Sequence, residues 1–146
     1  MKIRDAKKED LSNNLLDLYI QGFRYHYNAR PDVFGNKTDE QLENDLLNEL
    51  DKLNFLILED STIKGYIAYH IKDKHDRILW IDQLVIDEKY RKQGYGKELV
   101  NKLKEIAKNE KCKRVELNCW SFNQDAKKMY MHIGFVEQKT TLEIDI

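Results

Sequence analysis

Residues 90–97, which read Tyr-Arg-Lys-Gln-Gly-Tyr-Gly-Lys, constrain the fold more than any other part of this chain. An apolar run, residues 78–86, precedes this stretch, and an amphipathic segment, residues 98–108, follows it. The apolar run is typical of a buried strand, and apolar residues at helical spacing predict a helix. We therefore expect a strand, a glycine-containing turn and a helix in succession.

The turn has the features of an anion site. Gly94 and Gly96 would let the backbone approach a ligand without interference from Cβ atoms. The first amides of the following helix have no intrahelical acceptor and can point at an anion. Arg91, Lys92 and Lys97 add positive charge. The pattern predicts a pyrophosphate cradle; the alternative is a glycine-containing helix start that binds nothing.

Two familiar phosphate motifs do not fit. A P-loop needs Ser or Thr after its Lys, but Glu98 follows Lys97, and no Gly stands at Arg91. A dinucleotide-binding fingerprint needs a third Gly where Leu99 stands. What remains is R-x-x-G-x-G after a strand that ends Leu-Val-Ile, and this pattern resembles the acyl-CoA-binding motif of the GNAT superfamily of N-acetyltransferases.

Composition narrows the class of protein. A length of 146 residues with 41% hydrophobic residues predicts one folded domain, residues 1–146. A net charge of -1 gives no reason to expect nucleic acid or a membrane surface as a partner. The first residues lack the apolar core of a signal peptide, and Cys112 and Cys119 form no C-x-x-C. We expect a reduced, cytoplasmic protein without a metal site.

The periodicity of apolar residues predicts the order β-α-α-β-β-β-α-β-α-β(-β), an α/β fold with a central mixed, mostly antiparallel sheet flanked by helices. Asp10 or Ser12 would cap the first helix, and a capping box from Thr38 to Gln41 would open the second. The expected ranges outside these helices are a strand at 2–5, an aromatic loop at 23–35, strands at 55–58, 63–71 and 78–86, a hairpin loop at 72–77, a strand at 114–120, and final strands at 135–138 and 140–146.

A second motif strengthens the resemblance. The spacing Asn123-x-x-Ala126-x-x-x-Tyr130-x-x-x-Gly134-Phe135 is similar to a second GNAT motif, and the element order is similar over nearly the whole chain. The resemblance implies direct transfer of an acetyl group from acetyl-CoA to an amine of a small molecule or a protein. Homodimers are common among similar proteins, although no sequence feature specifies an interface.

The resemblance also implies which residues hold acetyl-CoA. The strand backbone would pair with the pantetheine amides if the sheet splays there, the turn would hold the pyrophosphate, and the Asn123 side chain would bind the pantetheine arm. For Asn123 the alternative is a helix N-cap. The cofactor-binding residues expected in this way are Leu84, Val85, Ile86, Arg91, Lys92, Gln93, Gly94, Tyr95, Gly96, Lys97 and Asn123.

The resemblance places Tyr130 at the position of the general acid. A phenol with a pKa near ~10 is protonated at neutral pH and can donate a proton to the leaving thiolate. The alternative is a buried aromatic residue on the helix stripe.

Asp82 is the candidate general base. It lies four residues before Ile86, so regular alternation would place it on the same strand face as Leu84 and Ile86. The resemblance supports it because an acidic residue stands at this strand position in some polyamine-acetylating relatives. The alternative is a solvated strand carboxylate, and His70 and Glu116 are rival bases.

Acceptor binding is assigned to the aromatic loop, where relatives form that site. Tyr25, His26 and Tyr27 would line the pocket, unless they only anchor the loop. Cys119 is expected to be a small core residue, because direct transfer needs no acyl-enzyme. Two other functions stay open: a CoA-binding sensor without turnover, and an interaction module that uses the cradle for a phosphopeptide.

Overall fold

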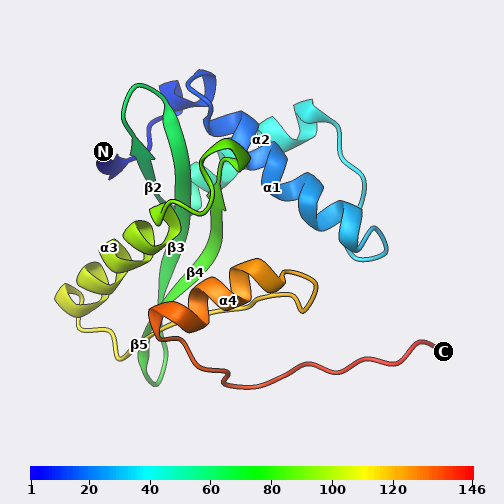
Figure 1. The fold of residues 1–146 in the computed structure, drawn as a ribbon, viewed down its shortest axis with the longest axis vertical. Helices are drawn as coiled ribbons and strands as arrows, with labels where there is room; N and C mark the ends of the chain where they lie inside the picture. The colour runs from blue at the N-terminus through cyan, green and yellow to red at the C-terminus, as the bar shows by residue number, and fades with distance from the viewer.

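The computed structural model describes residues 1–146 as a five-stranded sheet between two pairs of helices (Figure 1). The elements, in chain order, are β1 (Lys2–Asp5), η1 (Lys8–Ser12), α1 (Leu15–Ala29), α2 (Asp39–Lys52), β2 (Asn54–Glu59), β3 (Ile63–Asp73), β4 (Arg77–Ile86), η2 (Glu88–Tyr90), α3 (Tyr95–Asn109), β5 (Arg114–Leu117) and α4 (Gln124–Ile133). The predicted α/β class is confirmed, and so is the element order as far as α4.

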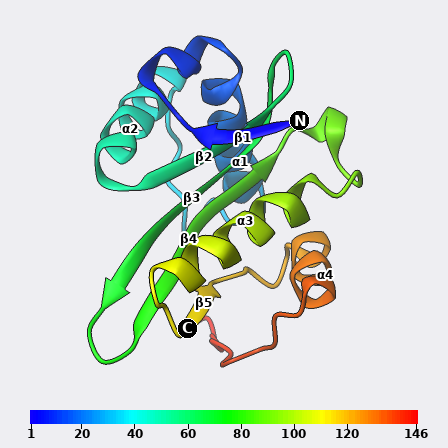
Figure 2. The same cartoon turned by 90° about the vertical axis from the view of Figure 1, so that its left-hand side faces the viewer.

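The sheet has the order β1-β2-β3-β4-β5. Its first three junctions are antiparallel, and only β4 and β5 run parallel. Helices α1 and α2 cover one face, and α3 and α4 cover the other (Figure 2). Each face therefore buries its own apolar cluster, and the alternating pattern of the strands supplies side chains to both.

Alternation along β4 changes phase in the middle of the strand. Leu79 and Ile81 belong to the cluster under α3 and α4, and Leu84 and Ile86 pack against that same cluster. The shift arises because Ile81 pairs with Tyr69 whereas Gln83 pairs with Ala68, which leaves Asp82 as the extra residue of a β-bulge. The expectation that Asp82 shares a face with Leu84 and Ile86 was therefore wrong.

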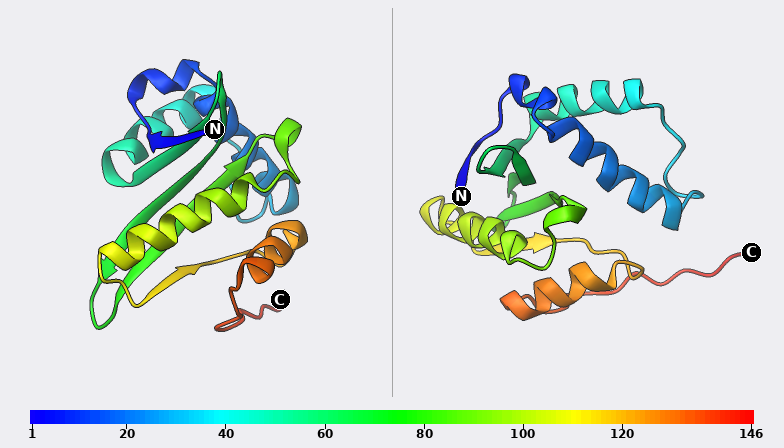
Figure 3. Two further views of the ribbon diagram at one scale, coloured as in Figure 1. Left: turned by 60° about the vertical axis from the view of Figure 1, so that its left-hand side comes forward. Right: turned by 45° about the horizontal axis from the view of Figure 1, so that its top comes forward.

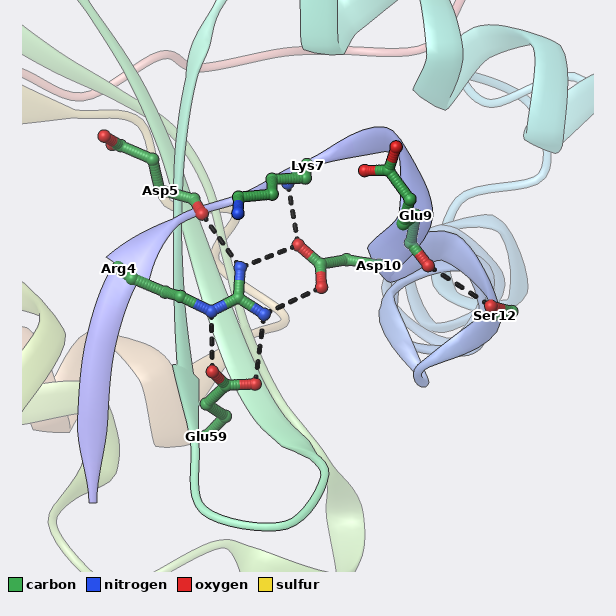
Figure 4. A network of polar contacts seen from close by, with 7 residues as sticks. All are labelled: Arg4, Asp5, Lys7, Glu9, Asp10, Ser12 and Glu59. Atoms are coloured by element: carbon green, nitrogen blue, oxygen red, sulfur yellow. Dashed lines mark hydrogen bonds and ion pairs between the residues drawn. The ribbon is translucent and has the colours of Figure 1, made fainter.

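The first helix begins later and ends later than predicted. Its N-cap is Asn14, in the left-handed region at φ 75°, and residues 8–12 form a 3-10 turn. Asp10 cannot cap α1 because its carboxylate accepts hydrogen bonds from Arg4 and from the backbone amide of Lys7 (Figure 4). At its other end α1 runs to Ala29, just before Arg30-Pro31, where the proline disfavours helical backbone at the preceding residue.

Three further ranges differ from the prediction. Residues 72, 73 and 77 pair in the β3–β4 ladder, so the hairpin loop is only residues 74–76. Strand β5 ends at Leu117 rather than at residue 120, because its parallel pairing with β4 stops there. Residues 135–146 form an extended tail instead of final strands, because no neighbouring strand offers them a hydrogen-bonding ladder (Figure 1).

The predicted capping box is present: the Thr38 hydroxyl accepts from the Gln41 amide, and the Gln41 side chain accepts from the Thr38 amide. At the other end of the chain, Gly134 closes α4 with φ 125°, as its position in the motif suggested. None of the helices is both long and apolar enough to cross a membrane.

Candidate active site

Strands β4 and β5 separate halfway along β4, and this separation creates a free strand edge (Figure 3). Their pairing stops at Ile81 and Leu117, whereas β4 continues to Ile86. Over that last stretch β4 is paired only with β3, for example Val85 with Tyr66. The backbone of Leu84–Ile86 therefore has one side without a strand partner, as an added strand-like ligand would require.

Helix α3 begins beside this edge without a side-chain cap. Gly94 is its N-cap, in the left-handed region at φ 84°, and Lys92 also has positive φ, 62°. The backbone amides of residues 91–97 donate no hydrogen bond within the backbone, whereas the amide of Glu98 reaches the Gly94 carbonyl. A run of free amides at a helix N-terminus favours an anion, and exposed Lys92 and Lys97 add positive charge.

The two glycines of the turn do different things. A Cβ at Gly94 would meet nothing within 4 Å, so this residue faces open space. A Cβ at Gly96 would lie 2.6 Å from Met129 Sδ, and Gly96 is buried. The absence of a side chain at Gly96 therefore allows the close contact between α3 and α4, whereas Gly94 faces open space.

The side chains of Arg91 and Gln93 form hydrogen bonds with other groups of the protein. The Arg91 Nε donates to the Ile86 carbonyl at 3.0 Å, and its Nη2 donates to Gln21 at 3.2 Å. Gln93 accepts a hydrogen bond from the Tyr95 hydroxyl. These contacts hold the turn against the end of β4 and leave Lys92 and Lys97 as the free cations of the predicted cradle.

Tyr130 lies on the inner face of α4. It is 9% exposed and its ring packs edge-on against Phe135, with centroids 5.4 Å apart. Burial, and secondarily Cys119, raises the pKa of Tyr130 well above the ordinary phenol value, so the hydroxyl is firmly protonated. The protein gives the Tyr130 hydroxyl no hydrogen-bond partner. Every fully buried polar side-chain atom has such a partner, so this hydroxyl must be in contact with solvent.

Asn123 does what the alternative reading predicted: it is the N-cap of α4, and its Oδ1 accepts from the Ala126 amide at 3.4 Å. The same oxygen lies 3.5 Å from the Tyr25 hydroxyl, at the limit of a hydrogen bond. Its Nδ2 has no partner within the protein, so the cap leaves the amide donor free for a ligand. Cys119 lies nearby, and burial raises the pKa of its thiol, which keeps it from acting as a thiolate nucleophile.

Two of the candidate bases lie together at the β4 bulge. His70 Nδ1 lies 2.7 Å from Asp82 Oδ2, and both side chains are part-buried. Glu116 is separate, because it forms an ion pair with Arg114 at 3.1 Å on β5. Sequence analysis did not predict the polar contacts next to this pair. Tyr66 donates a hydrogen bond to Gln83, and Gln83 donates one to Glu49 of α2, each at 2.7 Å.

The predicted acceptor residues lie on α1 rather than on a loop. Tyr25 and His26 both contact Phe122, with centroids 5.8 and 5.6 Å apart, in the connection between β5 and α4. Tyr27 points elsewhere and stacks on Phe23. The structure thus contains an aromatic cluster of which sequence analysis predicted only Tyr25 and His26. Its members are Tyr25, His26, Phe34, Trp120 and Phe122.

A signal for the missing members was present in the sequence. Trp120 and Phe122 immediately precede Asn123 in the second motif, so aromatic side chains were already adjacent to a candidate ligand residue. Arg30 lies over the Trp120 ring, 5.2 Å from its centroid, and joins this group to the chain that follows α1. The close approach of α1 to β4 positions the cluster, since a Cβ at Gly22 would lie 2.8 Å from Val85 Cγ2.

Comparisons with known proteins agree with this geometry. The sequence profile of the acetyltransferase (GNAT) family matches residues 14–135. A spermine/spermidine N(1)-acetyltransferase of Bacillus subtilis is 35% identical over 72 residues, which are 49% of this chain and 47% of that protein. An uncharacterized N-acetyltransferase of the same organism, YycN, is 29% identical over 83 residues, 56% of this chain and 53% of that one. The chain thus spans about half the length of these curated relatives.

Solved structures show the same fold. A mutant of the BH1408 protein from Bacillus halodurans superposes with a TM-score of 0.86 at 23% identity, covering 100% of this chain and 99% of that one. The aminoglycoside N-acetyltransferase AAC(6')-Iy, solved in complex with CoA, has a TM-score of 0.75 at 18% identity and covers 99% and 93% of the two chains. With the family profile matched over most of its length, the chain belongs to the GNAT acetyltransferase family.

Proposed function

We propose that the protein transfers an acetyl group from acetyl-CoA directly to a primary amine. The observation that carries the proposal is the meeting of three features at one place: the free edge of β4, the uncapped start of α3 and the protonated Tyr130 of α4. Strand-like pairing would hold the pantetheine arm along Leu84–Ile86, and the free amides with Lys92 and Lys97 would hold the pyrophosphate.

Tyr130 supplies the proton for the leaving group. Attack of the amine on the thioester carbonyl carbon forms the amide bond, breaks the carbon–sulfur bond and leaves CoA as a thiolate. The hydroxyl of Tyr130 is protonated because burial raises its pKa, so it can donate that proton to the sulfur.

Asp82 and His70 act on the acceptor. A primary amine with a pKa near ~10 needs about 4 kcal/mol to reach its neutral form at pH 7. The hydrogen-bonded pair can take up that proton, with Asp82 as the acceptor and His70 orienting the carboxylate through Nδ1–H. The nearby aromatic cluster would contact the acceptor; the relative that acts on spermine and spermidine makes polyamines the first amines to try.

Two measurements test the proposal. Calorimetry should detect acetyl-CoA binding, and a thiol reagent should detect free CoA when a panel of polyamines, aminoglycosides and peptide N-termini is added. Binding without thiol release on any amine would favour a CoA sensor, and no binding at all would favour the phosphopeptide-binding alternative.

A further inference from the structure

Three residues on one face of α1 connect the free edge of β4 with the end of the helix. Gly22, His26 and Arg30 are each four residues apart, so they follow one another along the same face. The His26 Nδ1 lies 2.8 Å from the Gly22 carbonyl oxygen, which can only accept, so Nδ1 carries the proton. The Arg30 amide in turn donates to the His26 carbonyl at 2.9 Å. Because a Cβ at Gly22 would lie 2.8 Å from Val85 Cγ2, this row of residues starts at the end of β4.

The guanidinium of Arg30, at the far end of this row, is held in one orientation. Its Nε and Nη2 donate to the two carboxylate oxygens of Asp32, at 2.9 and 2.8 Å. It also lies over the Trp120 ring, 5.2 Å from the centroid, and the Arg30 side chain is only 24% exposed. A donor group that is fixed before a ligand arrives loses less conformational freedom on binding.

The other edge of the Arg30 guanidinium binds a second carboxylate. Nη1 and Nη2 donate to the two oxygens of Glu143, at 2.8 and 3.3 Å. The Glu143 side chain is 65% exposed, and no backbone hydrogen bond holds residues 136–146 in place. Exposed ion pairs contribute little to stability, so a carboxylate on a ligand can replace Glu143 here. The contact shows which chemical group this edge of Arg30 recognises.

Aromatic rings line the space between His26 and Arg30. Phe34 lies 5.5 Å from the His26 ring and 5.8 Å from the Trp120 ring, and Phe122 lies 5.6 Å from the His26 ring. Apolar surfaces of this kind favour contact with the aliphatic part of a ligand. An acceptor that extends from the end of β4 to Arg30 would therefore have an apolar middle.

The spacing along α1 also restricts the length of the acceptor. Eight residues separate Gly22 from Arg30, which is about 12 Å along the helix axis. The amine and the carboxylate of an α-amino acid are bonded to the same carbon, so they are too close together to reach both ends. An aliphatic chain of several carbons reaches farther, and the long Arg30 side chain covers part of the distance.

We propose that Arg30 selects acceptors that carry a carboxylate at the opposite end of an aliphatic chain from the reacting primary amine. This assignment rests on the proposed acetyl transfer, because the amine must reach a thioester at the end of β4. The carboxylate replaces Glu143 on Nη1 and Nη2, the chain lies against Phe34 and Phe122, and the amine lies beside Val85. A polyamine would instead bring a second cation toward Arg30, and like charges repel.

Three primary amines with the same number of carbons test the selection in the full-length protein. They are ε-aminocaproate, hexylamine and hexamethylenediamine, whose far ends are a carboxylate, a methyl group and an ammonium group. Thiol release should give the highest kcat/KM for ε-aminocaproate, roughly tenfold or more above hexylamine, because hydrogen bonds between charged groups are strong. Hexamethylenediamine should be the poorest of the three. Equal values, or a preference for hexamethylenediamine, would overturn the proposal.

Variants of Arg30 separate recognition of the carboxylate from a structural role. Arg30→Gln should raise the KM for ε-aminocaproate by roughly tenfold or more and leave the kinetics with hexylamine unchanged. Arg30→Lys keeps the charge without the paired donors and should restore only part of the preference. Arg24→Gln is the matched control, since Arg24 of the same helix also lies over a ring, that of Phe23, and pairs with Asp39. An Arg30→Gln variant in which kcat/KM falls equally for all three amines would show a structural role and overturn the proposal.

Two further readouts keep the outcomes distinct. Circular dichroism and the Kd for acetyl-CoA, both unchanged from the parent, show that each variant is folded and that its cofactor site is intact. Thiol release with other amines but with none of these three would overturn the role of Arg30 alone. No thiol release with any amine would overturn the proposed function and this inference with it.

Discussion

His70 Nδ1 of β3 lies 2.7 Å from Oδ2 of Asp82, the extra residue of the β4 bulge. Ile81 faces α3 and α4, so Asp82, the next residue, faces the side of the sheet that carries Ala68, whereas the bulge returns Leu84 and Ile86 to the α3 and α4 face. The bulge thus re-aims the end of β4, and the Asp82 carboxylate beside it has His70 as its partner.

Asp82→Asn keeps the shape of this residue and removes the proton acceptor. We expect a lower kcat/KM near neutral pH that recovers partly as the pH rises, because the acceptor amine then becomes neutral without help. The comparison is a pair of kcat/KM–pH profiles on one amine. Profiles of the same height and shape would mean that the base is another group.

Tyr130→Phe retains the ring and its contact with Phe135 but removes the acid. General acid catalysis contributes ~10²–10⁴-fold, so kcat should fall by that order while the Kd for acetyl-CoA changes little. Because burial raises the pKa of Tyr130, its protonated form persists above the ordinary phenol value. The parent should therefore show no alkaline loss of kcat due to this group below pH ~10. If kcat is unchanged in this variant while the chemical step is rate-limiting, Tyr130 is only a core residue.

The cradle is tested through its free cations rather than through Gly96, because a side chain at Gly96 would displace Met129 and mix a packing effect with the binding effect. Lys92→Glu with Lys97→Glu should weaken acetyl-CoA binding by roughly tenfold or more, since charge-assisted contacts contribute ~1 kcal/mol or above each. Lys104→Glu with Lys108→Glu, farther along the same helix, is the charge-matched control. Equal Kd values for the two variants by calorimetry would argue against an anion at the α3 N-terminus.

Acceptor choice should depend on Tyr25 and His26 but not on Tyr27. The first two contact Phe122 of the β5–α4 connection, whereas Tyr27 stacks on Phe23. Tyr25→Ala with His26→Ala should raise the KM for the amine or change the ranking of amines, with the Kd for acetyl-CoA within a few-fold. Tyr27→Ala should keep the parental ranking. A double variant that keeps the ranking but loses acetyl-CoA binding would place these residues on the cofactor side.

The Arg4 ion pairs predict a pH-dependent stability. Arg4 donates to both Asp10 and Glu59, and the hydrogen bonds from Arg4 hold the pKa of Asp10 below its ordinary value (Figure 4). A depressed carboxyl pKa contributes stability above the unfolded value of ~3.9, and this contribution is lost as the pH falls through the folded pKa. Asp10→Asn should thus lower the free energy of unfolding at pH 7 by about 2 kcal/mol, with the difference shrinking in acid. Urea unfolding at several pH values measures this, and a pH-independent difference would contradict it.

The sequence by itself determined the elements whose signals are local. The capping box at Thr38, the glycine end of α4 and the strand-turn-helix around Gly94 all depend on neighbouring residues, and all were predicted. The two motifs, read together, also sufficed to place the chain in its family. Local backbone preferences and short motifs are properties of a few consecutive residues, so a sequence displays them.

Only the tertiary structure decided what depends on partners far along the chain. The pairing of β3 with β4 sets the bulge, which returns Leu84 and Ile86 to the α3 and α4 face, and it places Asp82 beside His70. The packing of α1 on β4 brings Tyr25 to Phe122, and the packing of α4 on α3 brings Met129 against Gly96. The strand pattern at 140–146 was legible in the sequence, yet a strand exists only where another strand accepts its hydrogen bonds, and this chain alone provides none.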